Sequence, residues 1–249
     1  AHGIALTISH FDGLAALDRK NPRPAFHLKL DTGMHRQGFQ EHEVPEVSRI
    51  LGVRRLAPEG VYSHLAAAED SRASRSQYAA FRRCLAELAG AGIRPRLTHL
   101  AATGGTLLRR APGRNLVRIG LGLYGYLPNG RRNVVRPVMT WKTIIGEVKR
   151  VRKGERIGYD LTERRKRDTV VAILPIGYWH GYDRGLSSIG EVLVHGWRAK
   201  VLGRVSMDMT AVDVTGNPGV RIGDEVVLIG RQGREFIGAD EMAGKISTT

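Results

Sequence analysis

The sequence is poor in cysteine, in aromatic residues and in long apolar segments. Cys84 is its only cysteine, so an intrachain disulfide is excluded and a reducing cytoplasm is the simpler compartment. No apolar run approaches the roughly 20 residues that a membrane-spanning helix needs. The first residues show no basic segment followed by an apolar core, so no secretion signal is visible. We therefore expect a cytoplasmic globular protein that does not enter a membrane.

Acidic residues are scarce beside basic ones: 24 Asp and Glu against 39 Lys and Arg give a net charge of +15. Such an excess suits nucleic acid, an anionic surface or an anionic small molecule. The basic residues are scattered, and the densest run is Arg164–Arg167. Aromatic residues make up only 6%, which is poor for base stacking, and neither an RNP motif nor zinc-finger spacing is present. We therefore expect neither nucleic acid nor a metal ion as ligand.

The first half of the chain alternates between strand and helix patterns. Strands are expected at 26–30, 61–63, 96–100 and 116–119, helices at 42–51 and 74–91, and a helical turn at 106–109. Strands that alternate with helices imply a parallel sheet. The spacing leaves room for part of a (β/α)8 barrel of the TIM type, but not for all of it.

The second half has a different character. Strand patterns separated by glycine-containing turns are expected at 138–151, 169–173, 190–194, 199–202, 210–214 and 225–229, without a long helical period. This pattern is typical of an all-β domain. The predicted fold class is therefore α/β plus all-β, with a partial barrel over residues 1–133 and a β-rich domain over residues 134–249.

Charged residues gather at the end of the strand over 26–30. The stretch 26–39 reads FHLKLDTGMHRQGF, so Lys29, Asp31 and Arg36 lie where a strand gives way to a glycine-containing loop. Ligands of α/β folds bind at this edge of the sheet. The alternative is a charged strand end in a surface turn, and the charges alone do not decide between them.

A second candidate is the glycine-rich stretch 117–125, VRIGLGLYG. A dinucleotide site would need a helix directly after it, and Pro128-Asn129-Gly130 argues against one. The better interpretation is that these glycines bring backbone N–H groups close to one phosphate.

These stretches resemble the motifs of bacterial alanine racemases. The first is similar to LKxDTGMxRxG, with His35 where glycine is usual, and the second to VRxGxxLYG. Residues 99–106 resemble HxANSxxT, with Thr103 in place of serine and Ala102 in place of asparagine, and residues 60–66 resemble GxxTHxA. In the second half, residues 154–160, 175–182, 203–208 and 223–230 resemble GxxVSYG, PIGYADGY, GRVSMD and GDxVxLxG.

The resemblance implies a racemase that uses pyridoxal 5′-phosphate (PLP). By it, the hydroxyl of Thr103 and the N–H groups of Gly120 and Leu121 face the phosphate, and His64 stacks on the ring. Arg118 faces the pyridine nitrogen. Because arginine keeps its own proton, it leaves that nitrogen unprotonated, which favours return of a proton to Cα over transamination.

The resemblance also implies how alanine is handled. Tyr159 is one base of a two-base proton transfer on a PLP aldimine, and Arg36 and the backbone of Met207 contact the substrate carboxylate. Tyr159 and Met207 serve the cofactor of the partner subunit in a head-to-tail homodimer. Lys29 matches a lysine that is carbamylated in several relatives, which would turn a cation into an anion beside Arg36.

The other base of the family is the Schiff-base lysine of a VxKANAYGHG motif, and this motif is absent from the sequence. We therefore expect the chain to lack the amino-terminal part that carries this lysine and to be inactive on its own. Two alternatives remain open: a racemase of broad substrate range, and a non-catalytic PLP-binding barrel.

Overall fold

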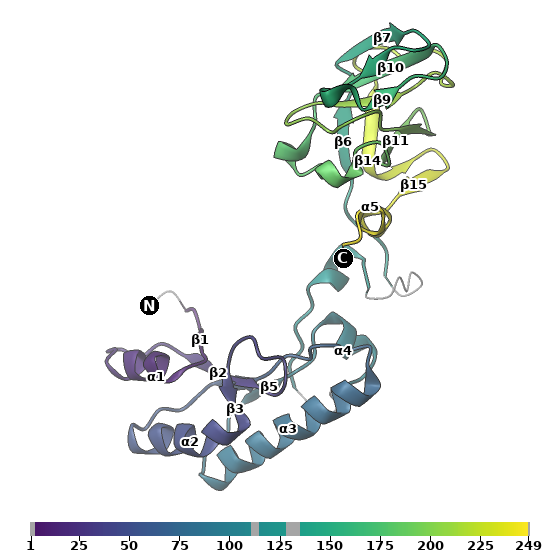
Figure 1. Ribbon diagram of the computed structural model, residues 1–249. Helices are drawn as coiled ribbons and strands as arrows, with labels where there is room; N and C mark the ends of the chain where they lie inside the picture. Colours follow the sequence, from purple (N-terminus) through teal and green to yellow (C-terminus); the bar gives the residue numbers. More distant parts are fainter. Residues whose placement is uncertain (1–2, 111–114, 128–134, 249) are drawn as a thin grey trace. The chain divides into compact units, whose positions relative to one another are not determined.

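The computed structural model describes residues 3–110, 115–127 and 135–248, and it divides into two compact units. The units are Ala1–Val135 and Arg136–Thr249 (Figure 1). The boundary predicted between residues 133 and 134 lies outside the described residues. Within the described part of the chain, no helix has the length and apolar character that crossing a bilayer would require.

The first unit is built on a parallel sheet in the order β1-β2-β4-β5, with β3 added beside the end of β2. The strands are β1 (Leu6–Ile8), β2 (Phe26–Asp31), β3 (Phe39–Gln40), β4 (Gly60–Tyr62) and β5 (Leu97–His99). The helices are α1 (Phe11–Asp18), α2 (Val44–Val53), α3 (Ser71–Gly90) and α4 (Thr103–Leu107), with 3-10 turns η1 (Glu41–Glu43) and η2 (Leu121–Tyr124). The sheet is open, so the described residues do not close a barrel.

The alternation along β2 separates an apolar face from a polar face. Phe26, Leu28 and Leu30 pack into a core with side chains of α1, α2 and α3. Because successive side chains of a strand point to opposite faces, His27 and Lys29 lie on the other face. The sheet therefore has one side covered by helices and one side that carries ionisable groups.

Most of the predicted elements of this unit are present, and one is wrong. The strands over 26–30, 61–63 and 96–100 appear as β2, β4 and β5, and the helix over 74–91 as α3. Residues 116–119 do not form a strand. Among the described residues only one backbone hydrogen bond, from Arg118 N to Ala101 O at 3.0 Å, ties this segment to its neighbour. Strand β1 and helix α1 were missed because the stretch 6–18 shows neither period over enough residues.

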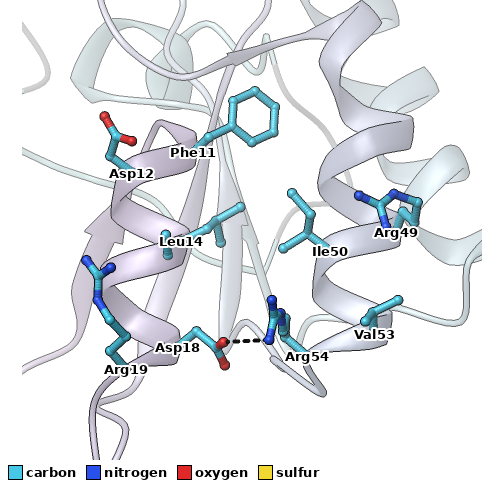
Figure 2. Close-up of a pocket in the computed structure, with 10 residues that line it drawn as sticks. Phe11, Asp12, Leu14, Asp18, Arg19, Arg49, Ile50, Val53 and Arg54 are labelled. Atoms are coloured by element: carbon cyan, nitrogen blue, oxygen red, sulfur yellow. Dashed lines mark ion pairs between the residues drawn. The ribbon is translucent and has the colours of Figure 1, made fainter.

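A groove of about 600 Å³ lies between α1 and α2. Figure 2 shows Leu14, Ile50 and Val53 along it, with the ion pair of Asp18 and Arg54 at one end. It contains none of the predicted site residues. The groove is thus a gap between two helices and not the candidate site.

The second unit consists of antiparallel sheets around its own core. Its strands are β6 (Trp141–Ile144), β7 (Glu147–Val151), β8 (Arg156–Ile157), β9 (Glu163–Arg164), β10 (Thr169–Leu174), β11 (Glu191–Val194), β12 (Trp197–Lys200), β13 (Thr210–Asp213), β14 (Glu225–Gln232) and β15 (Glu235–Ile237). The 3-10 turns η4 (Tyr159–Leu161), η5 (Tyr178–His180) and η6 (Arg184–Leu186) and the helix α5 (Ala239–Lys245) complete it. The sheets run β13-β10-β7, β12-β11-β14-β15 with β6 beside β14, and β8-β9.

Two predictions for this unit need correction. The strand expected over 138–151 is two strands, because Ile145 N donates to Asp224 O and Gly146 N to Ile173 O, which moves the chain from one sheet to the next. The unit is also not all-β, because it includes α5. That helix has Asp240 and Glu241 in its first turn and Lys245 in its last, which suits the helix dipole.

Two loops of the second unit are fastened to each other. Tyr178 N donates to Ser206 O at 3.0 Å and Trp179 N to Met207 O at 2.9 Å. A Cβ at Gly177 would collide with the carbonyl oxygen of Ser206 and lie 2.7 Å from that of Met207. Only glycine lets the two backbones approach this closely.

We expect Gly177→Ala to destabilise the second unit by about 2 kcal/mol or more. The new methyl group would meet backbone atoms, which cannot move aside as a flexible side chain could. Gly216→Ala is the matched control, since a Cβ there meets nothing within 4 Å. Urea denaturation of the wild type and both variants measures the difference. Equal midpoints for both variants would contradict this account of the loop contact.

Candidate active site

Asp31 organises the turn that follows β2. Its Oδ1 accepts hydrogen bonds from the N–H groups of Gly33, Met34 and His35 at 2.9, 2.9 and 3.1 Å. Burial by itself would raise the pKa of Asp31, but these donors outweigh it and hold the pKa below its usual value. His35, with φ of 54°, occupies the left-handed region that glycine prefers. The carboxylate therefore binds the backbone of the loop, and within the described residues it forms no ion pair with a cation.

Lys29 is a buried amine, only 5% exposed. Its Nζ donates to Leu30 O at 3.3 Å and lies 5.0 Å from the centroid of the Tyr62 ring. Burial, and then the charge of Arg118, lower the pKa of Lys29 to about 8, although Asp31 opposes the shift. A substantial fraction of this amine is thus unprotonated at mildly alkaline pH.

Arg118 is held by neutral acceptors. One terminal nitrogen, Nη1, lies 2.6 Å from His99 Nδ1. The other, Nη2, donates to Ser63 O at 2.9 Å, to His64 Nδ1 at 3.1 Å and to Leu100 O at 3.2 Å. No carboxylate of the described residues contacts the guanidinium, so no ion pair there offsets its positive charge.

The two histidines beside Arg118 are neutral for a physical reason. Arginine can only donate, so His99 Nδ1 and His64 Nδ1 must accept. Burial, followed by the charge of Arg118, lowers the pKa of His99 to about 4 and also lowers that of His64. Both imidazoles are therefore uncharged at neutral pH.

Thr103 connects the start of α4 with the glycine-rich stretch. Its Oγ1 accepts from Gly120 N and from Gly122 N, each at 3.2 Å. A Cβ at Gly122 would come within 2.9 Å of the Thr103 methyl group. Leu121 N, which begins η2, has no acceptor among the described residues. The Thr103 hydroxyl proton and the Leu121 N–H are thus available to an anion.

Arg36 lies on the surface of the loop after β2. It forms no ion pair within the described ranges, and its charge contributes to the lowered pKa values of Lys29 and His64. The first unit therefore brings together the predicted residues Lys29, Arg36, His64 and Arg118. Backbone contacts of the 118–122 segment link them to Thr103.

Tyr159 and Met207 belong to the second unit. Tyr159 is 68% exposed and opens the turn η4, in which Asp160 has a φ of 56° and pairs with Arg204 at 2.6 Å. Met207 is 52% exposed. The turn packs against the Met207 loop, since a Cβ at Gly158 would lie 3.4 Å from Arg204 N. Within this unit the two predicted residues are carried by touching loops.

The sequence interpretation missed the roles of Tyr62 and His27 and treated His99 as structural. The Tyr62 ring stacks on His99 with centroids 4.6 Å apart, and Arg118 Cζ lies 5.1 Å from the Tyr62 centroid. These side chains lie on the polar face of neighbouring strands, where the register pairs Lys29 with Tyr62 and Tyr62 with His99. That register is not visible in the sequence.

Comparison with known proteins agrees with this geometry. Residues 1–128 match the family model "Alanine racemase, N-terminal domain", and residues 138–249 match "Alanine racemase, C-terminal domain". The chain is 41% identical to the alanine racemase of Symbiobacterium thermophilum over 98% of its own length and 68% of the relative's. It is 37% identical to that of Desulfosudis oleivorans over 89% and 61% of the two lengths.

Solved structures show the same relationship. The alanine racemase from Bacillus anthracis with bound L-Ala-P has a TM-score of 0.88 at 32% identity, over 98% of this chain and 66% of that one. The alanine racemase from Bartonella henselae with covalently bound pyridoxal phosphate has a TM-score of 0.86 at 26% identity, over 99% and 68%. The chain thus spans about two thirds of these relatives. It belongs to the alanine racemase family.

Proposed function

We propose that the protein to which this chain belongs interconverts L- and D-alanine with the help of PLP. The observation that carries the proposal is the set of uncompensated cations on the polar face of the sheet. Lys29 and Arg118 are buried, Arg36 lies on the loop after β2, and the carboxylate of Asp31, which acts on Lys29 through its charge, accepts hydrogen bonds from backbone N–H groups. Such a site suits a ligand with a phosphate and a carboxylate.

The described residues fit the proposed cofactor. The Thr103 hydroxyl and the Leu121 N–H are donors without an acceptor of their own, and a Cβ at Gly120 would meet nothing within 4 Å. These groups would hold the phosphate. Arg118 would face the ring nitrogen, and His64 would lie against the ring. When bound, the cofactor supplies an electron-withdrawing ring that acidifies the Cα–H bond of the amino acid.

Arg118 has a distinct electronic task in this proposal. Its guanidinium cannot give up a proton at physiological pH, so a ring nitrogen that faces it stays an acceptor. The neutral acceptors His99 and His64 hold the guanidinium without drawing off its charge. Such an environment limits charge delocalisation into the ring and favours return of a proton to Cα.

Tyr159 is the proposed base of this chain, and its exposure supports a shared site. A phenol that is 68% exposed is a poor base at neutral pH unless positive charge stabilises its anion. Trp179 and Met207, on the two fastened loops, are 74% and 52% exposed. Exposed apolar side chains of this kind are typical of an interface. We propose that a second copy covers them and that Tyr159 and Met207 serve the partner's cofactor, with Arg36 on the substrate carboxylate.

Lys29 is the proposed site of carbamylation. A buried amine with a pKa of about 8 is unprotonated often enough to attack CO2, and the product would be an anion beside Arg118 and Arg36. Carbamylation would release a proton and replace two repulsive charge interactions, with Arg118 and Arg36, by two attractive ones.

Two other functions differ from this proposal in what they predict. A racemase of broad range would use the same residues and accept larger side chains. A non-catalytic PLP-binding barrel would need no Tyr159, and the β-rich second unit argues against it.

We expect the whole protein to racemise alanine and Tyr159→Phe to slow the reaction by about 100- to 10,000-fold, which is the usual range for loss of a general acid–base group. Affinity for PLP should be unchanged, because the phenol does not hold the cofactor. Circular dichroism at a fixed wavelength follows racemisation, and Tyr78→Phe on α3 is the control. Full activity of the Tyr159 variant would remove this residue from the proposal, and cofactor binding without racemisation by the wild type would favour the non-catalytic barrel.

Lys29 makes stability depend on pH in a defined direction. Its pKa is about 8 in the folded state against 10.5 for a free side chain, so between these values the unfolded state holds more protons and stability rises with pH. In CO2-free buffer we expect Lys29→Met to raise the free energy of unfolding at pH 7 by about 1–3 kcal/mol, with the gain disappearing towards pH 10.5.

Urea denaturation across this pH range measures the effect, and Lys20→Met, at an exposed position, is the control. Bicarbonate should stabilise the wild type but not the Lys29 variant if the amine is carbamylated. A gain that is constant from pH 7 to 10.5 would contradict the lowered pKa.

No lysine of the printed sequence stands in a VxKANAYGHG-like motif. We therefore propose that the lysine that attaches the cofactor is not among residues 1–249. Borohydride reduction of the PLP-loaded whole protein, followed by peptide mapping, should find the cofactor on no peptide from this range. Labelling of Lys29 would overturn the proposal.

A further inference from the structure

Two histidines on the polar face of the sheet form a contact that the proposed function leaves unused. His27 lies on β2 and His99 on β5, with β4 between them. His27 Nδ1 lies 2.9 Å from His99 Nε2. Together with the contact between His99 Nδ1 and Arg118 Nη1 at 2.6 Å, this makes a continuous hydrogen-bonded chain of three side chains.

The chain has only one consistent direction. Arg118 can only donate, so His99 Nδ1 accepts and the proton of the neutral ring must be on Nε2. That N–H points at His27, so His27 Nδ1 must accept. The low pKa of His99, about 4, keeps its ring neutral throughout the physiological range. The proton of a neutral His27 is therefore on Nε2, at the far end of the chain.

The far end carries a group that suits this direction. Glu59 precedes β4, and its Oε2 lies 3.8 Å from His27 Nε2. Its Oε1 pairs with Arg96 at 2.5 Å. At 3.8 Å the Glu59 carboxylate is too far from His27 for a direct hydrogen bond. Its negative charge still favours the tautomer of His27 that carries the proton on Nε2, the nitrogen that faces Glu59. Both ends of the chain thus favour the same arrangement of protons.

Packing holds both rings in place. Gly60 is paired with His27 in the register of β2 and β4, and a Cβ at Gly60 would lie 2.6 Å from His27 Nδ1. The absence of a side chain at Gly60 is what allows His27 to reach across β4. On the other side of the contact, the Tyr62 ring stacks on His99 with an interplanar angle of 7°. Stacking on Tyr62 thus restricts the rotation of the His99 ring, and the space at Gly60 accommodates the His27 ring.

We propose that His27 is a positioning residue for Arg118: it accepts the Nε2 proton of His99 and thereby keeps His99 Nδ1 turned to the guanidinium as an acceptor. If His99 carried its proton on Nδ1 instead, two donors would face each other at the Arg118 contact and the guanidinium would be displaced. The effect on cofactor binding rests on the proposed function, but the direction of the chain does not, because it follows from the three side chains alone.

The direction can be measured without any cofactor. In the whole protein, labelled with ¹⁵N at histidine, the ring-nitrogen shifts and their couplings to the carbon-bound ring protons report which nitrogen carries the proton. In the cofactor-free wild type we expect His99 to carry its proton on Nε2 and His27 to have no proton on Nδ1. A proton on Nδ1 of either ring would overturn the proposal, whether or not the protein proves to bind PLP.

Three variants then test the positioning role. His27→Phe keeps a ring of similar size but removes the acceptor, His27→Gln restores an amide oxygen that can accept, and His42→Phe alters an exposed histidine away from the chain. In His27→Phe we expect the His99 Nε2 signal to move and its proton to exchange faster with water. PLP should bind about tenfold more weakly, which is the effect of losing one buried hydrogen bond.

His27→Gln should recover PLP affinity to within about threefold of the wild type. The control His42→Phe should bind PLP as tightly as the wild type. Unchanged His99 signals and unchanged PLP affinity in His27→Phe would overturn the positioning role. If His27→Phe does not fold, the proton positions in the wild type and the PLP affinity of His27→Gln still test the positioning role. Failure of the wild type to bind PLP would count against the proposed function and leave the proton positions as the test of the chain.

Discussion

The structure of the site depends on one interaction, the burial of the Arg118 guanidinium against neutral acceptors. Removing a cation from water is costly unless its N–H groups are satisfied, and here two imidazole nitrogens and two carbonyl oxygens satisfy them. None of these partners cancels the charge. The guanidinium therefore keeps its electrostatic effect on its surroundings: burial is the main cause of the low pKa values of Lys29 and His99, and the charge of Arg118 is the next.

The parallel sheet makes this arrangement possible. On its helix-covered face, apolar side chains such as Leu28, Leu30 and Val61 are buried. Their burial stabilises the unit and offsets the repulsion between the like charges on the other face. The other face is then free to carry Lys29, Tyr62 and His99 in adjacent strands. An anionic ligand is the natural complement of such a face, and the phosphate of the proposed cofactor is one such ligand.

The second unit holds its candidate residues on loops. Its loops are fixed to each other by backbone contacts at Gly177 and Gly158, so the side chains that they carry, Tyr159 and Met207, are held in position while remaining exposed. Rigid loops with exposed functional groups are what a shared site between two subunits requires. The exposure of Tyr159 fits the role proposed for it in a dimer.

Local pattern explains why some elements could be predicted and others could not. The alternation in β2 and the apolar spacing of α3 are long enough to be recognised, and both elements were found. The segment 116–119 has strand-like residues, but within the described ranges a single backbone hydrogen bond, from Arg118 N to Ala101 O, ties it to its neighbour, and it forms no strand. The 138–151 stretch reads as one strand, and only its bonds to Asp224 and Ile173 divide it in two.

The sequence by itself determined the family, the two-part organisation and the identity of the candidate residues, because motifs and periodicities are local in the chain. Tertiary structure alone decided which neutral groups surround Arg118 and that His27 reaches His99 across Gly60. Those contacts join residues 18 to 72 positions apart. They arise from strand register and from the space that a missing side chain leaves, and neither is encoded in any short stretch of sequence.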